Sequence, residues 1–115
     1  INLVFGCGGE RDKEKRPIMG KIADKFCNSI YLTDDNPRNE NPKKIRSSIK
    51  RSITKSKLIE IPSRKLAIYK AVLNSKSDEI LIIATSSIKL EIFSKSKFFL
   101  IHFKSPTFCL SKFLL

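Results

Sequence analysis

The chain has 115 residues, of which 41% are hydrophobic, so it is large enough for one globular domain with a core of its own. Its net charge of +12 would favour a nucleic-acid ligand, but the lysines are scattered rather than gathered on one helix face, so we predict no nucleic-acid partner. No apolar run approaches the roughly 18 residues of a membrane span, and the N-terminus lacks the order of a secretory signal, so we expect a cytoplasmic protein without membrane contact.

Short apolar runs alternate with amphipathic segments along most of the chain. Strands are predicted around residues 3–5, 30–32, 58–61 and 80–83. Helices are predicted between them: one with Pro17 in its first turn, one after Asn41 and Pro42, and one capped by Ser63 whose apolar stripe is Leu66, Ile68, Ala71 and Val72. This order predicts an α/β fold, a Rossmann-like and mostly parallel sheet with helices on both faces.

A glycine turn, Gly6-Cys7-Gly8-Gly9, follows the first predicted strand. It resembles the dinucleotide fingerprint only poorly, because Arg11 stands where the third glycine would fall and the next helix begins late. A Rossmann-type nucleotide-binding module is nevertheless kept as the alternative function. Cys7 has no nearby histidine in the sequence, so we assign no catalytic residue. The three cysteines are widely spaced and there is a single histidine, so no metal site is predicted.

Residues 33–42 crowd acids, amides, an arginine and two prolines after the second predicted strand. Asp35 and Asn36 can hold an ammonium group, and the guanidinium of Arg38 can take a carboxylate through two parallel hydrogen bonds. Pro37 limits the freedom of the loop. The simplest ligand with both charges is an amino acid, although the pattern fits a solvated turn before a helix equally well.

Both turns follow strands of a predicted parallel sheet, so they are expected at the same edge of it. Arg11 from the first turn and Asp35, Asn36 and Arg38 from the second are then neighbours in space. We therefore predict one binding site shared by the two turns.

The composition changes after residue 84, where most of the phenylalanines lie among Ser, Lys, Leu and Ile with little turn chemistry. We expect residues 1–84 to form a partial domain and residues 85–115 to be an irregular tail, divergent or derived from a frameshift. A basic aromatic surface for membranes is the alternative for this tail.

Residues 5–20, FGCGGERDKEKRPIMG, together with residues 33–38, TDDNPR, closely resemble the C-terminal, amino-acid-binding domain of the Mur ligase family. The resemblance runs from about residue 1 to residue 84. It implies ATP-dependent addition of meso-diaminopimelate to UDP-MurNAc-L-Ala-D-Glu in peptidoglycan synthesis, through an acyl phosphate. By position, Arg11 matches the arginine that contacts diaminopimelate, and the four-residue selectivity motif falls on Asp35, Asn36, Pro37 and Arg38. Asp12 and Lys13 match the turn on the nucleotide side.

Two departures from the family pattern limit this expectation. The Gly-Lys-Gly-His-Glu segment that completes the family's amino-acid site is missing after Ala84. The domains that hold ATP, Mg²⁺ and the UDP-sugar are also missing from the chain. We therefore expect a decayed fragment that is inactive alone and whose partners include the missing Mur ligase domains.

Overall fold

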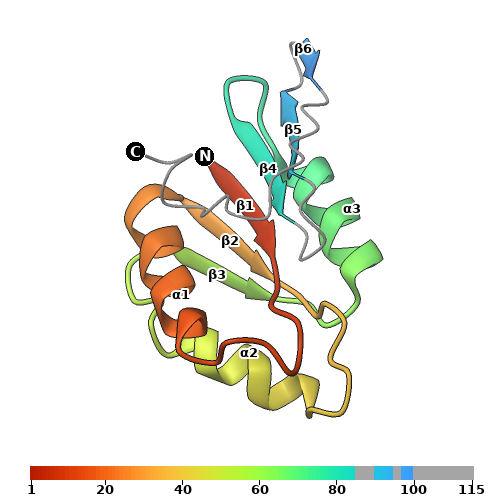
Figure 1. The fold of residues 1–115 in the computed structure, drawn as a ribbon. Coiled ribbons are helices and arrows are strands. Elements are labelled where there is room, and N and C mark those ends of the chain that lie inside the picture. The colour runs from red at the N-terminus through yellow and green to blue at the C-terminus, as the bar shows by residue number, and fades with distance from the viewer. Residues whose placement is uncertain (85–89, 95–96, 100–115) are drawn as a thin grey trace.

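The computed structural model describes residues 1–84, 90–94 and 97–99 (Figure 1). Its elements are β1 (Asn2–Phe5), α1 (Lys15–Phe26), β2 (Ser29–Leu32), α2 (Pro42–Lys50), β3 (Lys57–Glu60), α3 (Arg64–Asn74), β4 (Ile80–Ala84), β5 (Leu90–Ser94) and β6 (Lys97–Phe99). The strands and helices predicted up to residue 84 are all present. Among the helices in these ranges, none has the length and apolarity needed to span a bilayer.

The sheet has the strand order β3-β2-β1-β4-β5-β6, and its first four strands are parallel. The chain moves outward from β1 to β3 and then crosses back to place β4 on the other side of β1. This reversal makes the carboxyl ends of β1 and β4 a topological switch point, where α/β sheets usually bind ligands. The predicted α/β class and mostly parallel sheet are confirmed.

Helices cover both faces of the parallel strands, as predicted (Figure 1). In β1, Leu3 and Phe5 pack beneath α1 and α2, whereas Val4 points to the opposite face and packs beneath α3. The first core comprises Leu3, Phe5, Ala23, Cys27, Ile30, Leu32, Ile45, Ile49 and Ile82. The second comprises Val4, Tyr31, Ile61, Ala67, Ala71, Leu81 and Ile83.

The predicted helix caps form, but the predicted stripe of α3 is partly wrong. Asn41 accepts a hydrogen bond from the Lys43 amide at 2.9 Å, which satisfies an otherwise unpaired helical N–H. On α3, Leu66 and Val72 are 43% and 41% exposed. Ala71 is buried as predicted, and Ala67, one turn before it and outside the predicted stripe, is also buried, because their small side chains let the helix lie close to the sheet.

The expectation of an irregular tail is wrong for two of its segments. β5 pairs antiparallel with β4, and β6 pairs antiparallel with β5. Two physical reasons favour this strand. Without β5, the parallel sheet would end at β4 with unpaired backbone groups. In addition, Leu90–Ser94 contains residues that favour strands. Residues 85–89, 95–96 and 100–115 lie outside the described residues, and the domain boundary at residue 84 remains a prediction.

Candidate functional site

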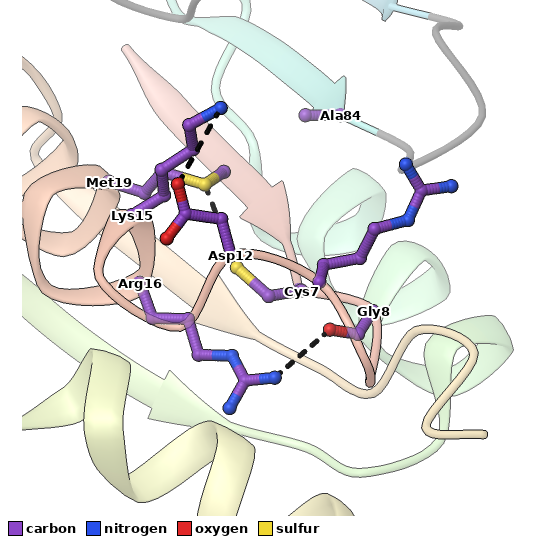
Figure 2. A pocket seen from close by; sticks show the side chains of 9 residues that line it. Cys7, Gly8, Asp12, Lys15, Arg16, Met19 and Ala84 are labelled. Atoms are coloured by element: carbon purple, nitrogen blue, oxygen red, sulfur yellow. Dashed lines mark hydrogen bonds and ion pairs between the residues drawn. The ribbon is translucent and has the colours of Figure 1, made fainter. Parts of the chain in front are cut away.

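A cavity of about 420 Å³ opens at the switch point (Figure 2). It lies between the turn after β1, the start of α1 and the end of β4. Its lining residues are Gly6, Cys7, Gly8, Arg11, Asp12, Lys15, Arg16, Met19 and Ala84. One part of the wall is therefore cationic and another is apolar, at the edge of the sheet where the topology favours ligand binding.

The glycine turn and the loop after β2 lie against each other. The Gly9 amide donates to the Asn36 carbonyl oxygen at 2.7 Å, and the Arg38 guanidinium donates to the Gly9 carbonyl oxygen. A Cβ atom at Gly9 would lie 1.8 Å from the Pro37 carbonyl oxygen, so only glycine allows this approach. The expected meeting of the two turns is thus found, and the glycine serves the contact between them.

Gly8 lies close to both arginines predicted to bind ligand. A Cβ atom at Gly8 would lie 3.7 Å from Arg11 Cγ and 3.6 Å from Arg38 Nη1. Both arginines are exposed, and Arg11 makes no hydrogen bond or ion pair with other residues of the described ranges. The aliphatic stem of Arg11 and the guanidinium of Arg38, from separate turns, therefore both lie beside Gly8.

The remaining residues of the predicted motif shape their own loop. Asp35 Oδ1 accepts from the Asn36 amide at 2.8 Å, and Asn36 Oδ1 accepts from the Arg38 amide at 3.1 Å. Pro37 is half-buried against the glycine turn. None of the residues from Asp35 to Arg38 lines the cavity itself, so this loop forms the neighbouring rim.

Asp12 and Lys13, both predicted for the nucleotide side, differ in their position relative to the cavity. Asp12 lines the cavity, and its carboxylate accepts from the Glu14 amide at 3.1 Å and lies 4.0 Å from Lys15 Nζ. Lys13 is exposed and lies outside the lining. Of these two residues, the structure therefore brings only Asp12 to the cavity wall.

A partly buried ion pair that the sequence analysis missed joins the start of α1 to the loop after β2. Arg16, only 5% exposed, donates from Nη1 to Glu40 Oε2 and from Nη2 to Glu40 Oε1, both at 3.0 Å. The bidentate contact with Arg16, helped by the Glu10 amide, lowers the pKa of Glu40 to about 2. Helical spacing contained a signal for this residue, because Arg16 shares one face of α1 with the buried Gly20 and Ala23.

A second ionic group fixes the start of the loop after β2. Arg46, on α2, pairs with Asp34 and with Glu60, the latter at 2.9 Å. Lys50 Nζ lies 3.0 Å from the other Glu60 oxygen. The hydrogen bond from Arg46, with help from Lys50, lowers the pKa of Glu60. These contacts hold the loop to α2 and to the end of β3.

Cys7 lines the cavity but is poorly suited to act as a nucleophile. Burial raises the pKa of its thiol to about 11, although the charge of Arg16 partly opposes this shift. The S–H group donates to Met19 Sδ at 3.6 Å (Figure 2). A neutral thiol with an internal partner is a weak nucleophile. In the described ranges, no group of three or more His, Cys, Asp or Glu side chains could hold a metal ion.

The family model described as "Mur ligase, glutamate ligase domain" matches residues 1–87. The chain belongs to the Mur ligase family. It is 52% identical over 84 residues to the UDP-N-acetylmuramoyl-L-alanyl-D-glutamate--2,6-diaminopimelate ligase of Rickettsia typhi, which covers 73% of this chain and 17% of the relative. It is 47% identical over 81 residues to ligase 1 of the same name from Clostridium acetobutylicum, covering 70% of this chain and 17% of the relative.

A solved structure of a diaminopimelate ligase of this name is also similar. It superposes with a TM-score of 0.68 at 39% sequence identity, over 72% of this chain and 18% of that one. The chain thus spans less than a fifth of the length of these Mur ligases. The matched part contains both turns of the candidate site.

The dinucleotide-binding alternative has less structural support. α1 begins only at Lys15, well after β1 ends at Phe5, so the glycine turn does not open directly onto a helix N-terminus as pyrophosphate binding requires. Gly6 and Gly9 face the backbone of the neighbouring loop, at Thr33 and Pro37. The glycines of this Mur ligase domain therefore bring protein segments together.

Proposed function

We propose that residues 1–84 form the amino-acid-binding part of a Mur ligase that adds meso-diaminopimelate, and that this ligand binds between Arg11 and the loop from Asp35 to Arg38. The observation that carries the proposal is that the side chains of Arg11 and Arg38, from separate turns, both lie beside Gly8. The names of the similar ligases, which specify 2,6-diaminopimelate, support the same ligand.

The chemistry of the ligand matches the charges on the two turns. Diaminopimelate carries a carboxylate and an ammonium group at each end, so Arg11 and Arg38 bind carboxylates while Asp35 and Asn36 bind an ammonium group. Pro37 limits the motion of the loop that carries them. Lysine lacks the second carboxylate and would leave the Arg38 guanidinium without its anionic partner, which disfavours lysine as a ligand.

In the complete ligase, ATP supplies the phosphoryl group that activates the D-glutamate side-chain carboxyl of UDP-MurNAc-L-Ala-D-Glu. The task of this domain is to present the diaminopimelate amino group to that carboxyl. Asp12 and Lys13 face the nucleotide side in this proposal, because they follow the ligand-binding turn and are exposed. The partners are the remaining Mur ligase domains, in the cytoplasm, and we assign no residue of this chain to Mg²⁺.

A calorimetric or NMR titration of the chain with meso-diaminopimelate and with L-lysine tests the ligand. We expect tighter binding of meso-diaminopimelate, and a loss of about tenfold or more in Arg11→Ala or Arg38→Ala, since a charge-assisted hydrogen bond contributes roughly 1.5–3 kcal/mol. Arg51→Ala is the matched control, because it removes the same charge from the exposed C-terminal end of α2. Equal affinity for the two amino acids, or equal losses in all three variants, would contradict the proposal.

The isolated chain is expected to have no ligase turnover, since it spans less than a fifth of the matched ligases. The measurement is phosphate release from ATP in the presence of meso-diaminopimelate and the UDP-MurNAc dipeptide. Release that depends on both amino-acid and dipeptide substrates would show that the chain is catalytically competent by itself.

A further inference from the structure

The two turns of the site contain the two non-glycine residues with positive φ in the described part of the chain. Glu10 has φ 54° and Arg38 has φ 48°. Residues of these types rarely adopt the left-handed conformation, so the surrounding structure has to stabilise it. Glu10 directly precedes Arg11, so both unusual conformations determine where a ligand-binding guanidinium points.

Both residues are held by hydrogen bonds that cross from one turn to the other. The Glu10 amide donates to Glu40 Oε1 at 2.6 Å, and Asn39 Nδ2 donates to Glu10 Oε1 at 2.8 Å. Arg38 donates to the Gly9 carbonyl oxygen. The left-handed conformations of Glu10 and Arg38 are therefore each stabilised by contacts with the other turn.

The bidentate pair of Arg16 and Glu40, which we call the inter-turn clasp, lies at the centre of these contacts. Arg16 Nη2 also donates to the Gly8 carbonyl oxygen at 3.2 Å. The clasp thus bonds the backbone on both sides of Gly9, at Gly8 and at Glu10, while Glu40 belongs to the loop that carries Arg38. The other ionic group, around Arg46, bonds the start of that loop, and the ion pairs of Arg46 go to Asp34 and Glu60 rather than to the glycine turn.

We propose that Arg16 and Glu40 are positioning residues of the amino-acid site, holding Glu10 and Arg38 in their left-handed conformations so that the guanidinium groups of Arg11 and Arg38 bind one ligand. This inference rests on the proposed function. Arg16 and Glu40 do not contact the ligand themselves in this proposal. They fix the turns that carry Arg11 and Arg38, and so they let the site distinguish diaminopimelate from an amino acid that lacks the second carboxylate. Displacement of a binding group by about 1 Å is enough to weaken such a site strongly.

The test compares Glu40→Gln and Glu40→Asp with the unmodified chain in titrations with meso-diaminopimelate and L-lysine, alongside thermal unfolding. Glu40→Gln removes the charge, and Glu40→Asp keeps it but shortens the reach by one methylene. Glu79→Gln is the matched control, because Glu79 also accepts hydrogen bonds, from Asn2 Nδ2 at 3.0 Å and the Lys76 amide at 2.8 Å, but at the opposite end of the sheet.

We expect both Glu40 variants to lose affinity for meso-diaminopimelate, by about tenfold in Glu40→Gln, and to lose most of the preference over lysine, while Glu79→Gln keeps both. Unchanged affinity in folded Glu40→Asp or Glu40→Gln, or an equal loss for the two amino acids, would overturn the positioning role and leave the proposed function standing. If Glu40→Gln does not fold, the result for Glu40→Asp decides. If the unmodified chain binds no meso-diaminopimelate, the proposed function fails and this inference fails with it.

Discussion

The thiol of Cys7 is the residue in the cavity wall whose reactivity can be checked most directly. Its pKa of about 11, raised mainly by burial, leaves it protonated at neutral pH. We expect iodoacetamide to alkylate Cys7 about a hundredfold more slowly in the folded chain than in urea at pH 8, because the thiolate is the reacting form. Peptide mapping by mass spectrometry gives the two rates. Equal rates would mean that the cavity wall is open to solvent.

Gly9 is where the two turns approach each other most closely. A methyl group would lie 1.8 Å from the Pro37 carbonyl oxygen, so Gly9→Ala has to push the turns apart and break the hydrogen bond between the Gly9 amide and Asn36. We expect a loss of about 1–3 kcal/mol in the free energy of unfolding, as for other overpacked positions. Urea denaturation measures it. A neutral effect would show that the two turns are not in contact in solution.

Gly8 is the matched position, because its added Cβ would have only ordinary contacts, the nearest at 3.5 Å. Its φ is not positive either, so alanine fits the backbone. We expect Gly8→Ala to change the free energy of unfolding by less than about 0.5 kcal/mol, but to weaken meso-diaminopimelate binding, since the methyl group would lie beside both Arg11 and Arg38. Normal binding by a folded Gly8→Ala protein would exclude this space as the ligand site.

At the scale of the elements, the contact between the glycine turn and the loop after β2 should depend on pH. Glu40 has a pKa of about 2 in the folded chain, against an ordinary value of 4.5. A lowered folded-state pKa gives stability that is fully present above about pH 4.5 and is lost as the pH falls toward 2. The difference in unfolding free energy between the unmodified chain and Glu40→Gln should therefore be constant from pH 7 to 5 and shrink below that range. A difference that is independent of pH would place the carboxylate of Glu40 outside the ion pair.

Local sequence patterns predicted the elements better than the way in which the elements pack. Asn41 and Ser63 were identified as caps, because a cap depends on groups only two or three residues away. The buried face of α3 was predicted to hold Leu66, Ile68, Ala71 and Val72. The structure buries Ala71 and, outside the prediction, Ala67 against the sheet, with Ile68 partly buried beside them, and leaves Leu66 and Val72 exposed. Distance between a helix and a sheet is a tertiary property, so the pattern within α3 alone could not decide it.

At the scale of the whole molecule, the repeated strand and helix order was enough to predict that the two turns share one edge of the sheet. Arg11 and Arg38 were expected to be neighbours on this ground, together with the motif resemblance, and both lie beside Gly8; their binding of a ligand stays a prediction. The pair of Arg16 and Glu40 was missed, because the two residues are 24 positions apart and both belong to strongly charged segments. Helical spacing placed Arg16 on the buried face of α1, but the choice of Glu40 as its partner depends on how the turns pack, and no local pattern records that contact.

The pairing of β5 with β4 carries the last prediction. Five residue pairs, from Ile80 with Ser94 to Ala84 with Leu90, cover the edge of an apolar strand. A chain that ends at Ala84 would expose this edge, and an uncovered apolar edge favours association between chains. We expect that chain to form oligomers or aggregates in size-exclusion chromatography with light scattering, while a chain ending at Phe99 remains closer to monomeric at the same concentration. Equal monomer fractions would mean that residues 1–84 are a complete unit and that β5 does not protect β4.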